Sequence, residues 1–580
     1  MYGGCDPYVW EDGEVMLTEN AALPGRAAPP RLESYEQARS SFRLEVPERY
    51  NPVIGIVDGW AEAQPDALAL LSLDGAGTVV GSHTAAEVAS MSRRAARALL
   101  AAGVAKGETV FVMLPRIPAW YWVMLGAMRI GAVPMPAPNL LTSHDIAYRI
   151  TRGQAVAAIT DASEKVDAIQ EDLPSLRLRI RWSPDGEGRH GWHDLDRLME
   201  EAGDGPTPTD PTSRHDPLIL FFTSGTVSYP KMVLHDQTYA LGHVATARFW
   251  HDLRPGDRHW TVTDTGWAKA AWGGLFGQWH ERATVVQVAL GKPDPDRILS
   301  LLAAHRITSF CAPPTLYRSL VQADLSAHDL SSLRHCTSAG EPLNPEVIRI
   351  WRAGTGGLTI YDGYGQTEAT CLVANFPAVP VRPGSMGRPM PGYEIDVLDD
   401  QGSSAADGEV GNIAVRAEPR PLGLFNGYHH DAAATAERFR DGWYYTGDRA
   451  ARDADGYIWF EGRDDDVITS SAYRIGPFEV ESTLIAHPAV AEAGVVGKPD
   501  PERTEVVCAF VILSPGYVPS EELTRELQRH AKRLSAPYKY PREVRYVREL
   551  PKTVSLKIRR SGLREWLRTG IPDGVELRPV

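Results

Sequence analysis

A loop rich in hydroxyl groups follows directly on an apolar segment near the middle of the chain. Residues 218–222 read LILFF, and residues 223–231 read TSGTVSYPK. The apolar run predicts a buried strand. The loop after it suits a polyphosphate, because hydroxyls and amides donate hydrogen bonds, a glycine permits close approach and a lysine adds charge. The order of residues differs from that of the Walker loop, so a simple nucleoside triphosphatase is not predicted. The residues with these roles are Thr223, Ser224, Gly225, Thr226 and Lys231.

Five later segments combine aromatic, acidic and basic residues. They are 337–343 (TSAGEPL), 361–368 (YDGYGQTE), 445–448 (YTGD), 461–466 (EGRDDD) and 550–559 (LPKTVSLKIR). Together with the loop at 223–231, they resemble the signature motifs of the adenylate-forming enzymes, which include acyl-CoA synthetases, acyl-activating synthetase domains and luciferases. The resemblance is strongest to medium-chain acyl-CoA synthetases. It extends over most of the chain, and the matching order of all six motifs argues against coincidence.

The resemblance implies a binding site for ATP. By it, Tyr364 stacks on the adenine ring, Asp362 accepts a hydrogen bond from the adenine amino group, and Thr367 donates one to the α-phosphate. Glu368 is expected to hold Mg²⁺, because a polyphosphate needs a hard cation and such a cation prefers carboxylate oxygen. The same resemblance adds to the nucleotide site Gly340, Glu341, Pro342, Gly365 and Gln366.

Four residues towards the C-terminus complete the implied site. Asp448 matches the aspartate that grips both ribose hydroxyls, and Arg463 matches an arginine that also reaches the ribose. Asp465 falls where the family pivots its small domain, so we expect a hinge there. Lys557 takes the position of the catalytic lysine in the C-terminal motif.

The chemistry implied by the resemblance is adenylation. An oxyanion, normally a carboxylate, attacks the α-phosphorus of ATP, pyrophosphate leaves, and a second nucleophile then attacks the adenylate. Attack on phosphorus requires neutralisation of charge above all. Mg²⁺ on Glu368, Lys557 between the carboxylate and the α-phosphate, and the loop 223–231 on the leaving pyrophosphate are expected to supply it. No nucleophile from the protein is needed.

The segment 264–272 (DTGWAKAAW) sits where related enzymes shape the acyl pocket. Trp267 and Trp272 could line an apolar slot for a short chain or an aromatic ring. Packing of both tryptophans against an internal helix is an equally good interpretation. Lys269 lies between them and could pair with a polar group of the substrate.

The identity of the acceptor is less clear from the sequence. Arg474, Arg503 and Tyr540 match residues that hold the CoA nucleotide in medium-chain enzymes. Three glycines that the family associates with thioester formation are replaced, however, by Ala472, Thr504 and Leu556. A side chain at a close-approach glycine narrows the path of the thiol.

Three functions follow from these observations. The leading hypothesis is an AMP-forming acyl-CoA ligase that uses ATP, Mg²⁺, CoA and a small or medium carboxylic acid. The second hypothesis transfers the adenylate to a carrier-protein thiol or to an amine, and includes activation of a small oxyanion such as nitrite. The third, a non-catalytic nucleotide-binding homologue, is disfavoured by the joint presence of Glu368, Asp448, Arg463 and Lys557.

The elements that must position these residues follow an α/β pattern. Helical stretches such as 84–102 alternate with β-branched runs such as 109–114, and further strands are predicted at 218–222, 284–288 and 307–311. Short strands at 412–416, 457–460 and 493–496 precede helices at 521–532 and 563–568. We expect an arm (1–45), a large multi-layer N-terminal domain with mixed sheets and flanking helices (46–464) and a small mobile α+β C-terminal domain (465–580) with the catalytic lysine.

Composition excludes several other classes of protein. The net charge of −14 over 580 residues predicts no attraction to nucleic acid or to an anionic membrane. The five cysteines are far apart, which argues against a disulfide framework or a zinc site and favours the cytoplasm. The most apolar segment, 119–135, contains Arg129, so a membrane span is not predicted, and no signal peptide is recognised. The sequence does not indicate an oligomeric state.

Overall fold

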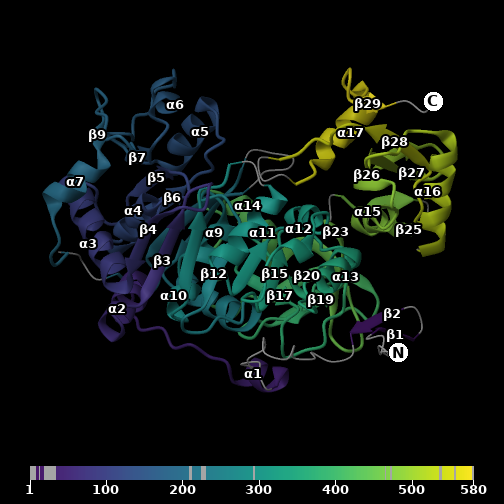
Figure 1. Ribbon diagram of the computed structural model, residues 1–580, viewed down its shortest axis with the longest axis horizontal. Helices are drawn as coiled ribbons and strands as arrows, with labels where there is room; N and C mark the ends of the chain where they lie inside the picture. Colours follow the sequence, from purple (N-terminus) through teal and green to yellow (C-terminus); the bar gives the residue numbers. More distant parts are fainter. Residues whose placement is uncertain are drawn as a thin grey trace. The chain divides into compact units, whose positions relative to one another are not determined.

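The computed structural model describes residues 8–11, 14–17, 34–207, 212–223, 230–291, 294–463, 466–470, 473–534, 539–553 and 557–577. The chain divides into two compact units (Figure 1). The first consists of residues 1–223, 231–394 and 416–442, and the second of residues 224–230, 395–415 and 443–580. The predicted boundary between 464 and 465 lies outside the described residues, and it stays a prediction.

The largest sheet of the first unit carries the middle of the chain. Its strands lie in the order β18 (Arg388–Pro389), β17 (Cys371–Ala374), β16 (Ile360–Gly365), β15 (His335–Ala339), β14 (Ser309–Ala312), β12 (Arg258–Thr261), β13 (Thr284–Val288), β3 (Leu68–Leu73) and β4 (Val79–Thr84). The pairs from β16 to β3 are parallel, and the edge pairs are antiparallel. Every residue of β13, β14 and β15 is buried, as expected where helices cover both faces of a parallel sheet.

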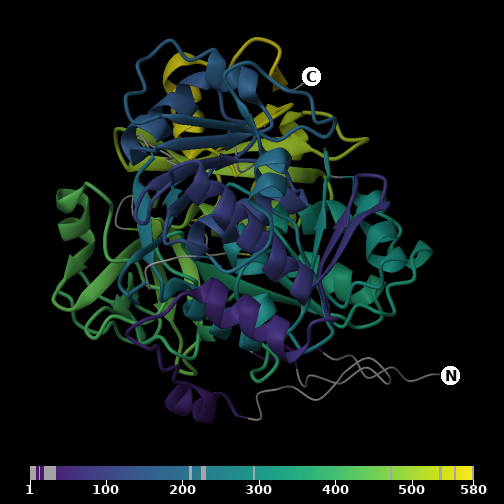
Figure 2. The same ribbon diagram turned by 90° about the vertical axis from the view of Figure 1, so that its left-hand side faces the viewer.

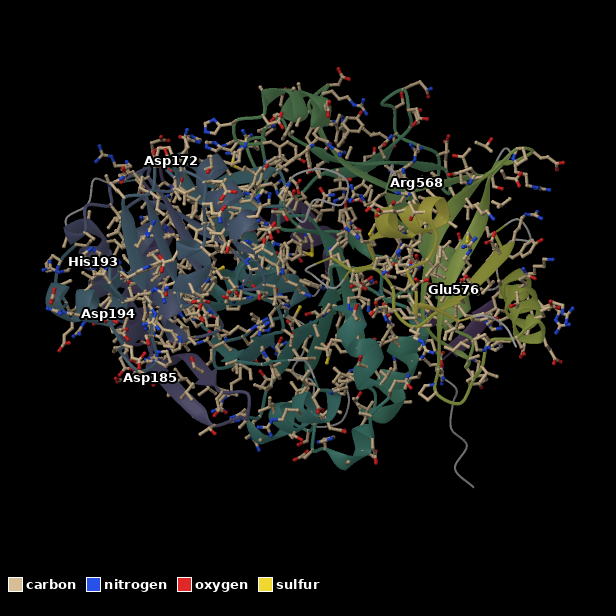
Figure 3. All side chains as sticks on the ribbon, turned by 90° about the horizontal axis from the view of Figure 1, so that it is seen from above. Asp172, Asp185, His193, Asp194, Arg568 and Glu576 are labelled. Atoms are coloured by element: carbon tan, nitrogen blue, oxygen red, sulfur yellow. The ribbon has the colours of Figure 1, made fainter. Side chains whose placement is uncertain are left out.

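A second sheet in this unit is parallel throughout. It runs in the order β6 (Val133–Pro136), β5 (Thr109–Met113), β7 (Ala157–Thr160), β8 (Leu178–Arg181) and β9 (His193–Asp194). Helix α4 (Pro118–Arg129) packs on β5 and β6, and α3 (Ala85–Ala101) packs on α4 (Figures 1 and 2). A Cβ on Gly126 of α4 would lie 2.6 Å from Cβ of Ala95 of α3, so the close crossing of these helices requires glycine. Polar side chains such as Asp172, Asp185 and His193 project outward from this region (Figure 3).

The apolar segment 119–135 is therefore part of the protein core. It forms most of α4 together with β6, and Arg129 is buried there with its guanidinium on Asp58 at 2.6 Å. In the part of the chain that the structure describes, no helix is both long and apolar enough to cross a membrane.

The remaining elements of the first unit connect and cover these sheets. An antiparallel pair, β10 (Pro217–Phe222) and β11 (Met232–Asp236), flanks the predicted phosphate loop. The short pair β1 (Tyr8–Glu11) and β2 (Glu14–Leu17) lies in the N-terminal arm, and β21 (Phe439–Arg440) follows α14. The other helices are α1 (Tyr35–Ser41), α2 (Gly59–Ala63), α5 (Ser143–Gly153), α6 (Ser163–Asp167), α7 (Leu195–Ala202), α8 (Tyr239–Ala245), α9 (Ala268–Gly274), α10 (Gly277–His280), α11 (Pro295–Ala304), α12 (Pro314–Leu320), α13 (Pro345–Gly354) and α14 (Ala432–Arg438).

Part of the N-terminal arm is more firmly packed than its sequence suggests. Helix α1 begins at Tyr35, whose side chain is 4% exposed and whose hydroxyl donates to the carbonyl oxygen of Pro389 at 2.9 Å. The guanidinium of Arg388 lies 4.1 Å from the centre of the Tyr35 ring. Because this helix buries the single aromatic side chain of Tyr35, its sequence shows no repeating apolar pattern. The sequence pattern therefore does not predict the packing of this segment.

The second unit has an α+β arrangement. One sheet includes β19 (Ile395–Leu398), β20 (Val410–Arg416), β22 (Trp443–Arg452) and β23 (Ile458–Arg463). The other runs in the order β25 (Tyr473–Ile475), β24 (Ile468–Ser470), β27 (Thr504–Leu513), β28 (Glu543–Val547) and β29 (Glu576–Leu577), with β26 (Val490–Asp500) beside β27. The helices are α15 (Pro477–Ile485), α16 (Glu521–Leu534) and α17 (Arg560–Thr569).

The predicted fold class is confirmed, and the predicted elements are present with shifted ends. Helix 84–102 and strands 109–114, 218–222 and 284–288 correspond to α3, β5, β10 and β13 within one residue at each end. The strand predicted at 307–311 begins two residues later, at Ser309, and the one predicted at 493–496 is only the middle of the long strand β26.

Candidate active site

The two ends of the predicted phosphate loop lie together at the tip of the β10–β11 hairpin. The amide of Thr223 donates to the carbonyl of Lys231 at 2.9 Å, and the amide of Lys231 donates to Oγ1 of Thr223 at 3.0 Å. The predicted strand before the loop is β10, which is confirmed. Ser224, Gly225 and Thr226 lie outside the described residues.

Lys231 and Glu368 contact the same tyrosine ring. The Lys231 ammonium lies 4.7 Å from the ring centre of Tyr428, and the Tyr428 hydroxyl donates to Oε1 of Glu368 at 2.8 Å. The amide of Phe425 donates to the carbonyl of Glu368 at 2.9 Å, which ties the same segment to the turn after β16. The sequence motifs do not include Tyr428, which stands 60 residues after Glu368.

The loops after β15 and β16 supply the other residues expected around adenine. These strands are parallel neighbours, with Ala339 opposite Gly363, so their carboxyl ends meet at one edge of the sheet. That edge brings the segment 340–342 beside the segment 366–368, which follows β16. Gly340 has φ +110°, a conformation that favours glycine. Pro342 and Gln366 lie in these two segments with it.

The carboxylate of Glu341 is held in place from α12. Oγ1 of Thr315 donates to Glu341 at 2.8 Å, and the guanidinium of Arg318 lies 3.3 Å from the same carboxylate. Thr315 and Arg318 both lie on α12, which follows β14, the strand beside β15 in the sheet. The segment after β15 is therefore anchored to the helix that follows the neighbouring strand.

Asp362 is a buried carboxyl beside a lysine. Its side chain lies within β16, and burial raises the pKa of Asp362 to about 8, although the Gly363 amide and the charge of Lys269 oppose that rise. The Lys269 ammonium donates to the carbonyl of Ala339 at 2.9 Å. Lys269 of α9 therefore lies at the edge where β15 ends, close to the predicted adenine site.

The tryptophans of the predicted acyl pocket differ in their surroundings. Trp272 is buried, and a Cβ on Gly365 would lie 2.4 Å from Cη2 of its indole, so β16 approaches this ring closely. The ring of Trp250 lies 6.4 Å from that of Trp272. Trp267 precedes α9 and is partly exposed. Trp272 thus packs in the core beside β16, and its contact with the substrate stays a prediction.

A buried histidine holds the turn that contains Thr367. Nε2 of His235 donates to the carbonyl of Thr367 at 2.7 Å, and the imidazole stacks on Tyr239 with ring centres 3.8 Å apart. Burial lowers the pKa of His235 to about 4, so the ring is neutral near pH 7 and Nε2 carries its hydrogen. No motif in the sequence indicates this contact, because it joins β11 to a turn 132 residues away.

In the second unit, the two residues expected to contact the ribose are neighbours. Asp448 of β22 pairs with Arg463 of β23 in the antiparallel register, and Asp448 is 8% exposed. The amide of Asp448 donates to Oγ1 of Thr446 at 3.2 Å, and this hydrogen bond restrains the backbone of β22 at Asp448. Their role on the ribose stays a prediction.

Lys557 lies on an exposed turn of the second unit. The amide of Thr553 donates to the carbonyl of Lys557 at 2.8 Å, and the Lys557 amide donates to Oγ1 of Thr553 at 3.2 Å. Leu556, Ala472 and the hinge candidate Asp465 lie outside the described residues.

The residues expected to hold the CoA nucleotide are described only in part. Tyr540 lies under the ammonium of Lys532 at 3.9 Å from the ring centre, and its hydroxyl accepts from Arg542 at 3.2 Å. The amide of Arg503 donates to Oδ1 of Asp500 at 2.9 Å. The side chain of Arg474 lies outside the described part of the structure.

Comparison with known proteins gives the family. Residues 57–429 match the AMP-binding enzyme family, and residues 479–557 match the AMP-binding enzyme C-terminal domain. The chain belongs to the AMP-binding enzyme family. It is 42% identical over 558 residues to the mitochondrial acyl-coenzyme A synthetase ACSM3 of Mus musculus, covering 94% of this chain and 95% of that one. It is 44% identical over 560 residues to the mitochondrial ACSM5 of Homo sapiens, with 94% and 95% covered.

Two solved structures of AMP-binding enzymes are similar along nearly their whole length. The anthranilate CoA ligase AuaEII in complex with anthranoyl-AMP has a TM-score of 0.83 and 31% identity, with 90% of this chain and 98% of that chain covered. The acyl-CoA synthetase of Brucella canis has a TM-score of 0.70 and 34% identity, with 93% and 99% covered.

This AMP-binding enzyme is an AMP-forming acyl-CoA ligase. It activates a carboxylic acid as the acyl-adenylate and transfers the acyl group to CoA, with ATP and CoA as substrates. The predicted AMP-forming acyl-CoA ligase is thus confirmed, while the use of Mg²⁺ stays a prediction. The relatives named above give no support to a carrier-protein, amine or nitrite route. Both curated relatives are mitochondrial proteins, so the cytoplasmic location of this AMP-binding enzyme stays a prediction.

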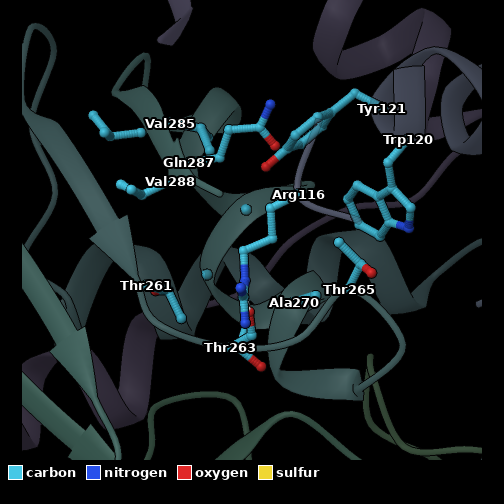
Figure 4. A pocket seen from close by; sticks show the side chains of 13 residues that line it. Arg116, Trp120, Tyr121, Thr261, Thr263, Thr265, Ala270, Val285, Gln287 and Val288 are labelled. Atoms are coloured by element: carbon cyan, nitrogen blue, oxygen red, sulfur yellow. Dashed lines mark hydrogen bonds between the residues drawn. The ribbon is translucent and has the colours of Figure 1, made fainter. Parts of the chain in front are cut away.

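A small cavity of the ligase lies beside α9 and was not expected from the sequence. Figure 4 shows the Arg116 side chain extending towards Thr263, with Gln287 and Tyr121 near the other end. Nη1 of Arg116 donates to the carbonyl of Leu290 at 3.0 Å. The cavity measures about 30 Å³, which is room for about one water molecule.

Proposed function

We propose that the edge formed by β15, β16 and the β10–β11 hairpin binds ATP for adenylation of a small or medium carboxylic acid. The observation that carries this proposal is the meeting of the Lys231 ammonium and the Glu368 carboxylate at Tyr428. A triphosphate with its metal needs a cation for its oxygens and an anion for its metal, and these two side chains supply both from one place. Asp362 and Tyr364 lie on β16, and their side chains are suited to binding the adenine ring.

Mg²⁺ fits this set of residues. Among the residues that the structure describes, no group of three or more His, Cys, Asp or Glu side chains is arranged to hold a metal by itself. Mg²⁺ is usually bound by one or two carboxylates together with the phosphates of the substrate, and Glu368 offers one carboxylate beside the Lys231 cation. Glu368 would hold the ion, which supplies charge neutralisation on the polyphosphate when bound.

Adenylation in this proposal follows the assignment made from the motifs. A carboxylate oxygen of the acid forms a bond to the α-phosphorus, and the bond from the α-phosphorus to the bridging oxygen of pyrophosphate breaks. Lys557 neutralises charge on the acid and the α-phosphate, and the Thr367 hydroxyl donates to the latter. The thiol of CoA then attacks the acyl carbon, its proton is lost, and AMP leaves.

The acid pocket in this proposal is bordered by α9. Trp272 offers an apolar wall, and Lys269, whose ammonium donates to the carbonyl of Ala339 near Asp362, offers a cation for a polar group of the acid. We infer a small or medium aliphatic acid or an aromatic acid. The similar structure of an anthranilate CoA ligase supports the aromatic class.

Release of AMP from ATP tests the proposed substrate class. Purified protein is assayed with aliphatic acids of increasing length and with benzoate-type acids, each with and without CoA. We expect CoA-dependent release for small or medium acids and none for nitrite. Release with long-chain acids only would contradict the acid class, and CoA-independent turnover would revive another acceptor.

A further inference from the structure

Tyr428 combines two contacts that no sequence motif predicts. Its hydroxyl donates to Oε1 of Glu368 at 2.8 Å, and its ring face lies 4.7 Å from the Lys231 ammonium. The side chain is 7% exposed. A neutral, nearly buried side chain thus holds an anion at one end and a cation on its face.

The backbone around Tyr428 is fixed directly to the strand that follows the phosphate loop. Val233 of β11 forms an antiparallel bridge with Tyr428, and the amide of His429 donates to the carbonyl of Met232 at 2.9 Å. The Tyr428 amide donates to Oγ1 of Thr435 at 2.8 Å. Because β11 begins one residue after Lys231, this bridge sets the distance between the phenol and the end of the loop.

We propose that Tyr428 is a positioning residue that orients the Glu368 carboxylate towards the metal and holds Lys231 ready for the phosphates. The proposal rests on the function proposed above for Glu368 and Lys231. The hydroxyl donates to Oε1 and thereby fixes the orientation of the Glu368 carboxylate. An uncharged donor can do this without competing with the metal, whereas an ammonium on the carboxylate would compete.

The ring acts on the lysine in a different way. A cation over the face of a tyrosine ring is held weakly, which is enough to restrict a flexible side chain and little enough to release it to phosphate oxygens. The two contacts are chemically separable, because phenylalanine keeps the ring and loses the hydroxyl, and leucine loses both.

Two variants and one matched control test the proposal. Tyr428→Phe should raise the Mg²⁺ concentration for half-maximal ATP–pyrophosphate exchange by about tenfold, the loss typical of removing a hydrogen-bond partner of a metal ligand. Its KM for ATP at saturating Mg²⁺ should change little. Tyr428→Leu should show the same metal effect and, in addition, a several-fold higher KM for ATP and for pyrophosphate.

The control is Tyr393→Phe, which removes another buried hydroxyl from the same unit. The Tyr393 hydroxyl lies 2.7 Å from Oγ1 of Thr370 and 3.0 Å from the carbonyl of Leu422. We expect this variant to lose stability without any change in Mg²⁺ dependence. Circular dichroism melts of all variants establish that they are folded.

A binding measurement removes the dependence on turnover. Mn²⁺ replaces Mg²⁺, and free Mn²⁺ is followed by electron paramagnetic resonance in the presence of a non-hydrolysable ATP analogue. Tyr428→Phe should weaken Mn²⁺ binding about tenfold and leave binding of the analogue without metal unchanged. Equal Mn²⁺ affinity in Tyr428→Phe and the unchanged protein, or equal losses in Tyr428→Phe and Tyr393→Phe, would overturn the proposal. Absence of exchange in the unchanged protein with every acid would instead defeat the proposed function.

Discussion

Asp448 and Arg463 face each other in the antiparallel pair of β22 and β23. Directly opposite residues of such a pair project from the same face of the sheet with their Cβ atoms about 5 Å apart, so both can reach one sugar. The two residues belong to different sequence motifs, one on each strand of the β22–β23 hairpin. Only the register of the two strands makes them neighbours.

Substitution of Asp448 should weaken ATP binding through the ribose. We expect Asp448→Ala to raise the KM for ATP and to abolish the preference for ATP over 3′-deoxy-ATP, because the carboxylate that accepts from the hydroxyls is gone. Arg452→Ala serves as the control. Arg452 lies on β22 like Asp448 but pairs with Asp396, so this variant should keep the preference. A preference that survives in Asp448→Ala would contradict the ribose assignment. Steady-state kinetics with both nucleotides measure it.

Loss of Lys557 should remove stabilisation of the transition state. Lys557→Ala is expected to slow carboxylate-dependent ATP–pyrophosphate exchange by about 100- to 1,000-fold, the usual effect of removing one charge-stabilising donor. ATP affinity, measured by calorimetry, should stay nearly constant. Lys552→Ala is the matched control, since Lys552 stands on the same segment and pairs with Glu492 at 2.9 Å. Full exchange activity in Lys557→Ala would show the assignment to be wrong.

The raised pKa of Asp362 should make folding stability depend on pH. Its pKa in the folded protein is about 8, against an ordinary value of 3.8, so between these values the folded chain binds more protons than the unfolded chain. The contribution of Asp362 to stability is therefore greatest at low pH and is lost as pH rises towards 8. Asp362→Asn should gain stability relative to the unchanged protein between pH 5 and pH 9. Urea unfolding across this range checks it, and a constant difference would contradict the raised pKa.

Buried histidines should make the protein unstable in acid. Burial lowers the pKa of His235 and His335 to about 4 and that of His259 to about 3. The unfolded chain binds protons from about pH 6.5 downward, while the folded chain does not, so stability should fall as pH decreases through this window. In urea titrations, His259→Gln should reduce the slope of stability against pH between 6.5 and 5. The exposed His144→Gln should leave that slope unchanged, and equal slopes in both variants would contradict the prediction.

Thr504 occupies a strained backbone position. Its φ is +67°, in the left-handed region that a β-branched residue rarely adopts, and the family resemblance implies a glycine at this position. Relief of the strain is worth roughly 1 to 2 kcal/mol, and the greater entropy of glycine in the unfolded chain offsets about half of it. We expect Thr504→Gly to unfold at higher urea concentration than the unchanged protein. Thr504→Ala should gain less stability than Thr504→Gly. A lower urea midpoint for Thr504→Gly than for the unchanged protein would contradict the proposed strain.

The local sequence determined the chemistry of this protein and most of its elements. The order of the motifs from Thr223 to Lys557 implies adenylation, and the strands β10 and β13 and the helix α3 follow from runs of apolar residues. Such patterns depend on neighbouring residues only, so a sequence is sufficient to recognise them.

The tertiary structure decided which distant residues meet. Tyr428 reaches Glu368 because Val233 of β11 bridges to it, and the His235 imidazole reaches the Thr367 carbonyl from the same strand. The raised pKa of Asp362 depends on burial by residues from several elements. These properties follow from strand register and packing, which join positions more than fifty residues apart, and no local pattern in the sequence encodes such a contact.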